Sequence, residues 1–412
     1  MMDRRQFLGA IAATAASRAL PAREAGSPPA LTPQSQIEPI VAAARPLLGG
    51  AIPADLAQRL GATHYAGKYH LTDEPFIIEG SKALLNLGMR VAKYWFGPSL
   101  PGYAFNSDWK LRPDMRLADV ARHPYFQQCF AMPFAAFALE IQPVARGSLF
   151  AKDADFAADE EQFAELTEHL LRTYRDREVT FILQHWEGDW MLRGTGVQWD
   201  RNGPADLEVR CTGFARWLEA RQNGVNQGRA KAGESKCKVY HATEVNRVID
   251  ILSGIPTLTS HVLPRVSVDM ISWSSYDGAG NVTKFWQGLE LIERHARPAP
   301  DGKPPRVFIG EIGYPENGRT EAEIVAFWDK AMGVMLARQV PYIIHWELYC
   351  NEPIDKNTGR PGVRRADEMR GFWLIKPDGS LSPAAEYFKA LLAHAGGRLP
   401  DAVRDRWRQR PA

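Results

Sequence analysis

The sequence has few cysteines, almost no net charge and no long apolar run. Its four cysteines form no Cys-x-x-Cys pair, so a zinc site built on that spacing is not expected. The formal net charge is +2 without a basic stripe, which argues against a nucleic-acid partner. In an oxidising compartment any two cysteines could pair, and the sequence does not choose among them. They are Cys129, Cys211, Cys237 and Cys350.

The N-terminus has the features of an export signal. The pair Arg4-Arg5 precedes a small, apolar run over residues 10–16, which is too short to span a bilayer. Adjacent arginines in this position predict the twin-arginine (Tat) translocase as the partner during export. We therefore expect a signal peptide over 1–25, a linker or N-terminal segment over 26–45, and a mature bacterial protein that is periplasmic or secreted, with no stable membrane span.

Short β-rich runs alternate with longer amphipathic runs along the rest of the chain. This alternation predicts βα units around a parallel sheet. Apolar residues spaced i, i+3, i+4 and i+7 predict helices over 160–174, 282–295, 321–338 and 383–393. No G-x-G-x-x-G follows a strand, which disfavours a doubly wound nucleotide-binding sheet. The eight predicted strands cover residues 62–65, 90–96, 135–141, 179–186, 238–242, 268–273, 307–310 and 342–346.

Eight strands with helices between them are the number that a (β/α)8 TIM barrel needs. We expect one α/β domain over 46–397, followed by a C-terminal tail over 398–412. Long βα loops, such as 97–113 and 349–371, would stand on the C-terminal rim, where such barrels carry their active sites. Many of the 12 Trp and 12 Tyr lie near strand ends, and flat aromatic faces in such a cleft suit a carbohydrate substrate.

Four glutamates stand at or just after predicted strand ends: Glu187, Glu244, Glu311 and Glu347. One such residue alone is usually a solvated rim charge or half of a salt bridge. Hydrolysis of a glycosidic bond, however, needs two carboxyl groups, one to protonate the leaving oxygen and one to attack the sugar or activate water. Strands four and seven lie across the barrel mouth, so Glu187 and Glu311 are expected to face each other at about 5 Å, the retaining distance.

The segment 309–315, Ile-Gly-Glu-Ile-Gly-Tyr-Pro, resembles the nucleophile strand of clan A of the retaining glycoside hydrolases. The resemblance extends over most of the chain. It implies a glycosidase that cleaves O-glycosidic bonds in a poly- or oligosaccharide and uses no cofactor. It also implies Glu311 as nucleophile and Glu187 as acid/base. Trp346 would form the floor under the cleaved sugar, and Tyr276 would hydrogen-bond the nucleophile.

The chain departs from that family just before the strand-four glutamate. The family usually has an asparagine there, which binds the sugar 2-hydroxyl, whereas this chain has Trp186. Asn246, Gln184 and His185 are the candidates for that contact. Asp189 and Glu244 are the alternative acids if Glu187 points elsewhere. The other expected substrate contacts are His185, His241, Trp186, Trp190, Asn246 and Glu244.

Two other functions remain open. One is a non-catalytic polysaccharide-binding barrel in exopolysaccharide assembly or export, which would need only the aromatic cleft. The other is a metal-dependent hydrolase on the same barrel. No His-x-His pair ends strand one, so we expect no metal and assign the histidines to sugar hydroxyls. Two glutamates in one site favour the glycosidase, and three converging histidines would favour the metal enzyme. The histidines near strand ends are His64, His70, His185, His241 and His345.

Overall fold

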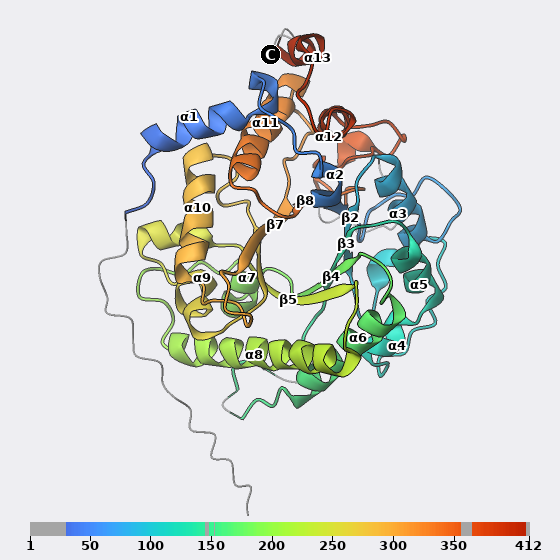
Figure 1. Ribbon diagram of the computed structural model, residues 1–412, viewed down its shortest axis with the longest axis vertical. Coiled ribbons are helices and arrows are strands. Elements are labelled where there is room, and N and C mark those ends of the chain that lie inside the picture. The colour runs from blue at the N-terminus through green and yellow to red at the C-terminus, as the bar shows by residue number, and fades with distance from the viewer. Residues whose placement is uncertain (1–29, 145–147, 152, 356–364, 409–412) are drawn as a thin grey trace, which may run out of the picture. The chain divides into compact units, whose positions relative to one another are not determined.

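Eight parallel strands pair in chain order and close into a barrel, because β1 pairs with both β2 and β8 (Figure 1). The structure is a computed structural model that describes residues 30–144, 148–151, 153–355 and 365–408. The predicted (β/α)8 barrel is therefore confirmed, and each predicted strand is present. The strands are β1 (Leu60–Thr63), β2 (Val91–Trp95), β3 (Ala136–Glu140), β4 (Thr180–Gln184), β5 (Lys238–Val245), β6 (Met270–Ser274), β7 (Arg306–Ile312) and β8 (Ile343–His345).

Strands β5 and β7 extend further than the sequence predicted. The predicted strands stopped at residues 242 and 310, but Glu244 and Glu311 lie within the strands themselves. A glutamate ends an apolar run in the sequence, yet here the barrel interior supplies charged partners for both side chains. The consequence is that both carboxyls are held by sheet backbone, which is more rigid than a rim loop.

Helices surround the barrel (Figure 1). The four helices predicted from apolar spacing are confirmed as α6, α10, α11 and α12. Helix α8, the longest of the described helices at 26 residues, was not predicted. The α-helices are α1 (Gln34–Ala44), α2 (Leu56–Arg59), α3 (Phe76–Asn86), α4 (Leu117–Ala121), α5 (Pro124–Ala131), α6 (Ala157–Thr173), α7 (Gly188–Arg193), α8 (Leu207–Ala232), α9 (Leu258–His261), α10 (Val282–His295), α11 (Glu321–Ala337), α12 (Pro383–Ala393) and α13 (Asp401–Arg408).

Segments before and after the predicted domain also pack on the barrel. Within the predicted linker or N-terminal segment, α1 buries Ile37 and Val41 beside α10 and α11. In the predicted tail, Trp407 of α13 is buried, and its indole N–H donates to Glu321 at 3.0 Å. Both segments therefore contain packed helices. The signal peptide predicted over 1–25 lies outside the described residues.

The cysteines and the helices bear on two further expectations. All four cysteines are buried and free, so the structure pairs none of them. Within the described ranges, no helix combines the length and the hydropathy that crossing a bilayer requires.

Candidate active site

A buried lysine lies at the centre of the barrel. Lys93 of β2 is inaccessible to solvent, and its ammonium contacts Glu140 of β3 at 3.1 Å, Glu244 of β5 at 3.2 Å and Glu311 of β7 at 3.2 Å. Burial alone would lower the pKa of Lys93, but the three carboxylates outweigh it and raise that pKa well above its usual range. Four strands thus converge on one charged cluster, which holds Glu311 from below.

Glu244 anchors this cluster without facing a substrate. It is fully buried and accepts from Ser272 Oγ at 2.7 Å and from Gln184 Nε2 at 2.9 Å, in addition to Lys93. Its second oxygen accepts the backbone N–H of Glu187 at 3.0 Å. Every contact therefore orients another part of the site, so the structure places Glu244 as a support for Glu187.

Glu311 presents its carboxylate between two donors. The Tyr276 hydroxyl donates to Oε1 at 3.1 Å, as the sequence predicted, and the Lys93 ammonium donates to Oε2 at 3.2 Å. Burial raises the pKa of Glu311 to about 7, with Lys93 opposing that rise and the charge of Glu244 adding to it. Glu311 is thus oriented through both oxygens and ionises near neutral pH.

Glu187 follows β4 directly and is 9% exposed. Ser274 Oγ donates to its Oε1 at 2.7 Å, and Ser274 is the strand neighbour of Glu311 across β6 and β7. Burial and then the negative charge of Glu311 raise the pKa of Glu187 well above its usual range. The site therefore holds one carboxyl that keeps its proton beside another that loses it more readily.

Aromatic rings stand beside these carboxyls. Trp346 is half-buried just after β8, and its ring centroid lies 5.9 Å from that of Trp95. Trp95 stacks on Tyr65 at 4.6 Å with an interplanar angle of 8°, and the Lys93 ammonium lies 5.7 Å from the Trp95 ring. The peptide bond between Trp346 and Glu347 is cis. These rings give the site flat apolar faces of the kind on which sugar rings stack.

Two predicted substrate contacts face away from the site. His185 packs against Phe214 and Trp217 of α8, and His241 packs against Phe163 of α6. Successive residues of a strand point to opposite faces, so the inward orientation of Gln184 and Glu244 turns His185 and His241 outward. Burial lowers the pKa of both, that of His185 to about 4. The structure does not bring these histidines to the barrel mouth.

Asn246 and Asp189 hold each other rather than a ligand. Asn246 Oδ1 accepts the Asp189 N–H at 2.9 Å, and Asp189 Oδ2 accepts the Asn246 N–H at 2.9 Å. Both are buried, and their contacts fasten the start of α7 to the end of β5, which positions Glu187. Trp186 and Trp190, which flank this turn, are half-buried.

Sequence reasoning missed Lys93, Glu140, Ser274 and Trp95. A lysine in the middle of the strand Val-Ala-Lys-Tyr-Trp was an available signal, because an isolated charge in a buried strand needs a charged partner. Within the described parts of the chain, no group of three or more His, Cys, Asp or Glu has the arrangement of a metal site.

Trp346→Ala should reduce kcat/KM by about tenfold or more on any substrate that the protein turns over, because an aromatic face under a sugar contributes on the order of 1–2 kcal/mol. The measurement is steady-state kinetics, with circular dichroism to show that the fold is retained. Unchanged kinetics in a folded variant would leave Trp346 with a packing role only.

No protein-family model and no curated protein sequence matches this chain. Several solved structures are similar in fold. A family 39 β-xylosidase from Caulobacter crescentus has 14% identity and a TM-score of 0.48, over 85% of this chain and 74% of that one. A family 5 broad-specificity endoglucanase from Clostridium longisporum has 11% identity and a TM-score of 0.48, over 83% and 98%. The match to a Bacteroides uniformis β-glucuronidase has 10% identity and a TM-score of 0.44. It covers 81% of this chain but only 34% of that longer protein. Such low identities bear on fold alone.

Proposed function

We propose that this protein is a glycoside hydrolase that acts with retention of configuration. The observation that carries the proposal is the pairing of two glutamates in one site, with a raised pKa on Glu187 and two hydrogen-bond donors on Glu311. Glu311 attacks the anomeric carbon while Glu187 protonates the departing oxygen. Glu187 then takes a proton from the water that displaces Glu311 from the sugar.

The charges of the site suit both steps. The negative charge of Glu311 raises the pKa of Glu187, which favours the acid form needed first. When Glu311 becomes an ester, that charge disappears and the pKa of Glu187 falls. Glu187 is then better suited to act as a base in the second step. Lys93 and Tyr276 hold the Glu311 carboxylate in place for the attack.

The pH dependence of activity follows from the same two groups. We expect a bell-shaped plot of kcat/KM, because Glu311 must be ionised and Glu187 protonated. Activity should fall as the pH drops through about 7, where Glu311 takes up a proton, and should fall again at higher pH, where Glu187 loses its proton. A profile that stays flat from pH 5 to pH 10 would contradict these roles.

The test of the function is a screen of polysaccharides and aryl glycosides, of neutral and acidic sugars, against the wild type and Glu311→Ala. Release of reducing sugar or aryl alcohol by the wild type alone supports the proposal. Polysaccharide binding without turnover would favour the non-catalytic barrel. Activity that a chelator abolishes would favour the metal-dependent hydrolase.

We also propose that the protein is exported to the bacterial periplasm or secreted through the Tat translocase. The support is the Arg4-Arg5 pair before a short apolar run. Replacing both arginines by lysine should retain the precursor in the cytoplasm, as measured by fractionation and immunoblotting. Normal appearance of the lysine variant in the periplasm would rule out this route.

A further inference from the structure

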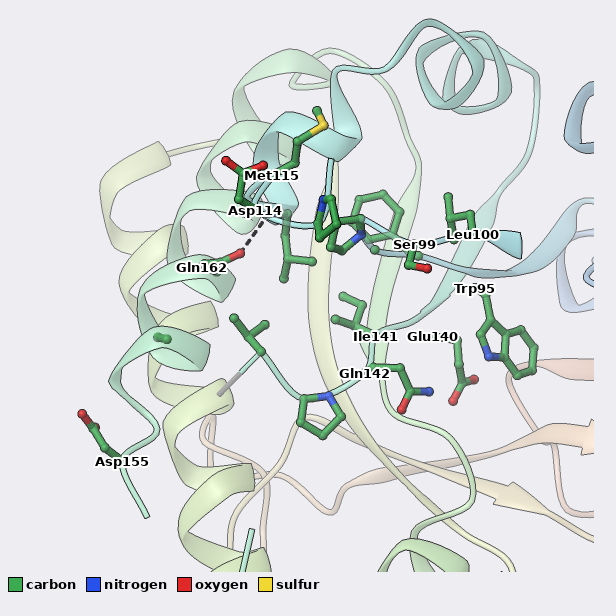
Figure 2. Close-up of a pocket in the computed structure, with 18 residues that line it drawn as sticks. Trp95, Ser99, Leu100, Asp114, Met115, Glu140, Ile141, Gln142, Asp155 and Gln162 are labelled. Carbon is green, nitrogen blue, oxygen red and sulfur yellow. Dashed lines mark hydrogen bonds between the residues drawn. The ribbon is translucent and has the colours of Figure 1, made fainter. Parts of the chain in front are cut away.

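A cavity of about 640 Å³ opens beside the active site, between the loops that follow β2 and β3 (Figure 2). Trp95 and Glu140 stand at one end of it, and Asp114, Met115 and Gln162 stand at the other. The proposed reaction does not use this space. Its lining residues include Phe96, Leu100, Leu117, Ile141, Pro143 and Val144.

Trp95 and Glu140 belong to both the cavity and the active site. Glu140 is fully buried, and its Oε2 contacts Lys93 at 3.1 Å and Gln184 at 3.1 Å. Its Oε1 has no hydrogen-bond partner among the described residues. Burial raises the pKa of Glu140 to about 8, so near neutral pH it carries a proton that it can donate. A buried, unpartnered oxygen at the wall of a cavity points to a polar atom of a ligand.

The chemistry of the lining selects the rest of that ligand. Most lining side chains are apolar, and no lysine, arginine or histidine is found among those that the structure describes. The charged or acidic groups are Asp114, Asp155 and Glu140, which would repel an anion. Gly97 is buried, yet a Cβ added to it would meet nothing within 4 Å, so the space beside this glycine is open.

We propose that this cavity binds an uncharged alkyl or aryl substituent next to the reacting sugar, with Glu140 hydrogen-bonding an oxygen where that substituent joins the sugar. The inference rests on the proposed glycosidase function and deepens it by naming a substrate class. The substrate is then a neutral glycoside with an apolar group, rather than a polysaccharide of uronic acids or sulfated sugars.

The test compares the binding of thioglycosides, in which sulfur replaces the scissile oxygen and slows hydrolysis. Isothermal titration calorimetry is run with hexyl and methyl 1-thio-β-D-glucopyranoside. The hexyl compound should bind at least about tenfold more tightly, because each buried methylene adds to affinity. Gly97→Leu should remove that difference by filling the cavity. Gly280→Leu is the matched control, since Gly280 is exposed on the turn after β6 and its added Cβ also meets nothing.

Equal affinity for the two thioglucosides, or no binding of the hexyl compound, would overturn the proposal. So would hexyl 1-thio-β-D-glucuronide binding more tightly than the hexyl glucoside. If Gly97→Leu does not fold, Ala158→Phe fills the same cavity from an exposed position on α6. Because binding is measured without turnover, tight hexyl binding by a protein that hydrolyses no glycoside would refute only the glycosidase. Hydrolysis with no effect of the hexyl group would refute only the cavity.

Discussion

Glu311→Gln is expected to lower kcat by roughly 10⁴-fold or more on every substrate, on the scale that removal of a covalent nucleophile produces. Glutamine has nearly the same shape, but its amide is a poor nucleophile and cannot form the glycosyl ester. The loss should appear with good and poor leaving groups alike, because no first step remains. Steady-state and single-turnover kinetics measure both cases.

The matched control is Glu178→Gln, which makes the same chemical change at an exposed position just before β4, at the opposite end of the barrel. This variant should keep wild-type kinetics. Thermal melts of both variants separate a chemical loss from a folding loss. Retention of more than about a tenth of wild-type kcat by a folded Glu311→Gln protein would contradict the nucleophile assignment, because one missing nucleophile costs several orders of magnitude.

Glu187→Ala is expected to give a different pattern. With a poor leaving group, activity should fall by about 10²–10⁴-fold, the usual contribution of a general acid. With an activated leaving group such as dinitrophenolate, the first step should survive, since little protonation is needed. The second step should then limit the rate, and azide should restore turnover by attacking the sugar without a base.

The product of that rescue is a glycosyl azide with the configuration of the substrate, and NMR spectroscopy identifies it. Azide should not rescue Glu311→Gln with retention. If both variants lose equal activity on every substrate and azide changes neither, the division of roles between Glu187 and Glu311 is wrong.

Most of the barrel could be predicted because its elements carry strong periodic signals. Helix α10 was placed at its observed bounds, since its apolar residues recur with helical spacing. Helix α8 gave a weak signal because its buried face includes Arg221 and Gln222, whose partners lie on other elements. Arg221, for example, pairs with Asp159 of α6 in the interior. Such pairs depend on tertiary structure and leave no local pattern.

The site could be predicted only in part, for a similar reason. Glu187 and Glu311 were identified because they stand where strands end on the catalytic rim. Lys93 was not, because its burial depends on Glu244 and Glu311, which lie 151 and 218 residues away. The two histidines were placed in the site because the sequence leaves the inward face of each strand open. A shift of one residue in that phase moves His185 or His241 from one face of the sheet to the other.

The most direct test of the account is to trap its covalent intermediate. A 2-deoxy-2-fluoro glycoside with a dinitrophenolate leaving group, of the sugar found in the screen, should form the ester with the enzyme and release it slowly, because fluorine destabilises the oxocarbenium-like transition state. Mass spectrometry of the proteolysed protein should find the sugar on Glu311, within the peptide that contains Ile309 to Gly313. Label on another carboxylate, or rapid hydrolysis in which no label accumulates and the product is inverted, would contradict the proposed mechanism.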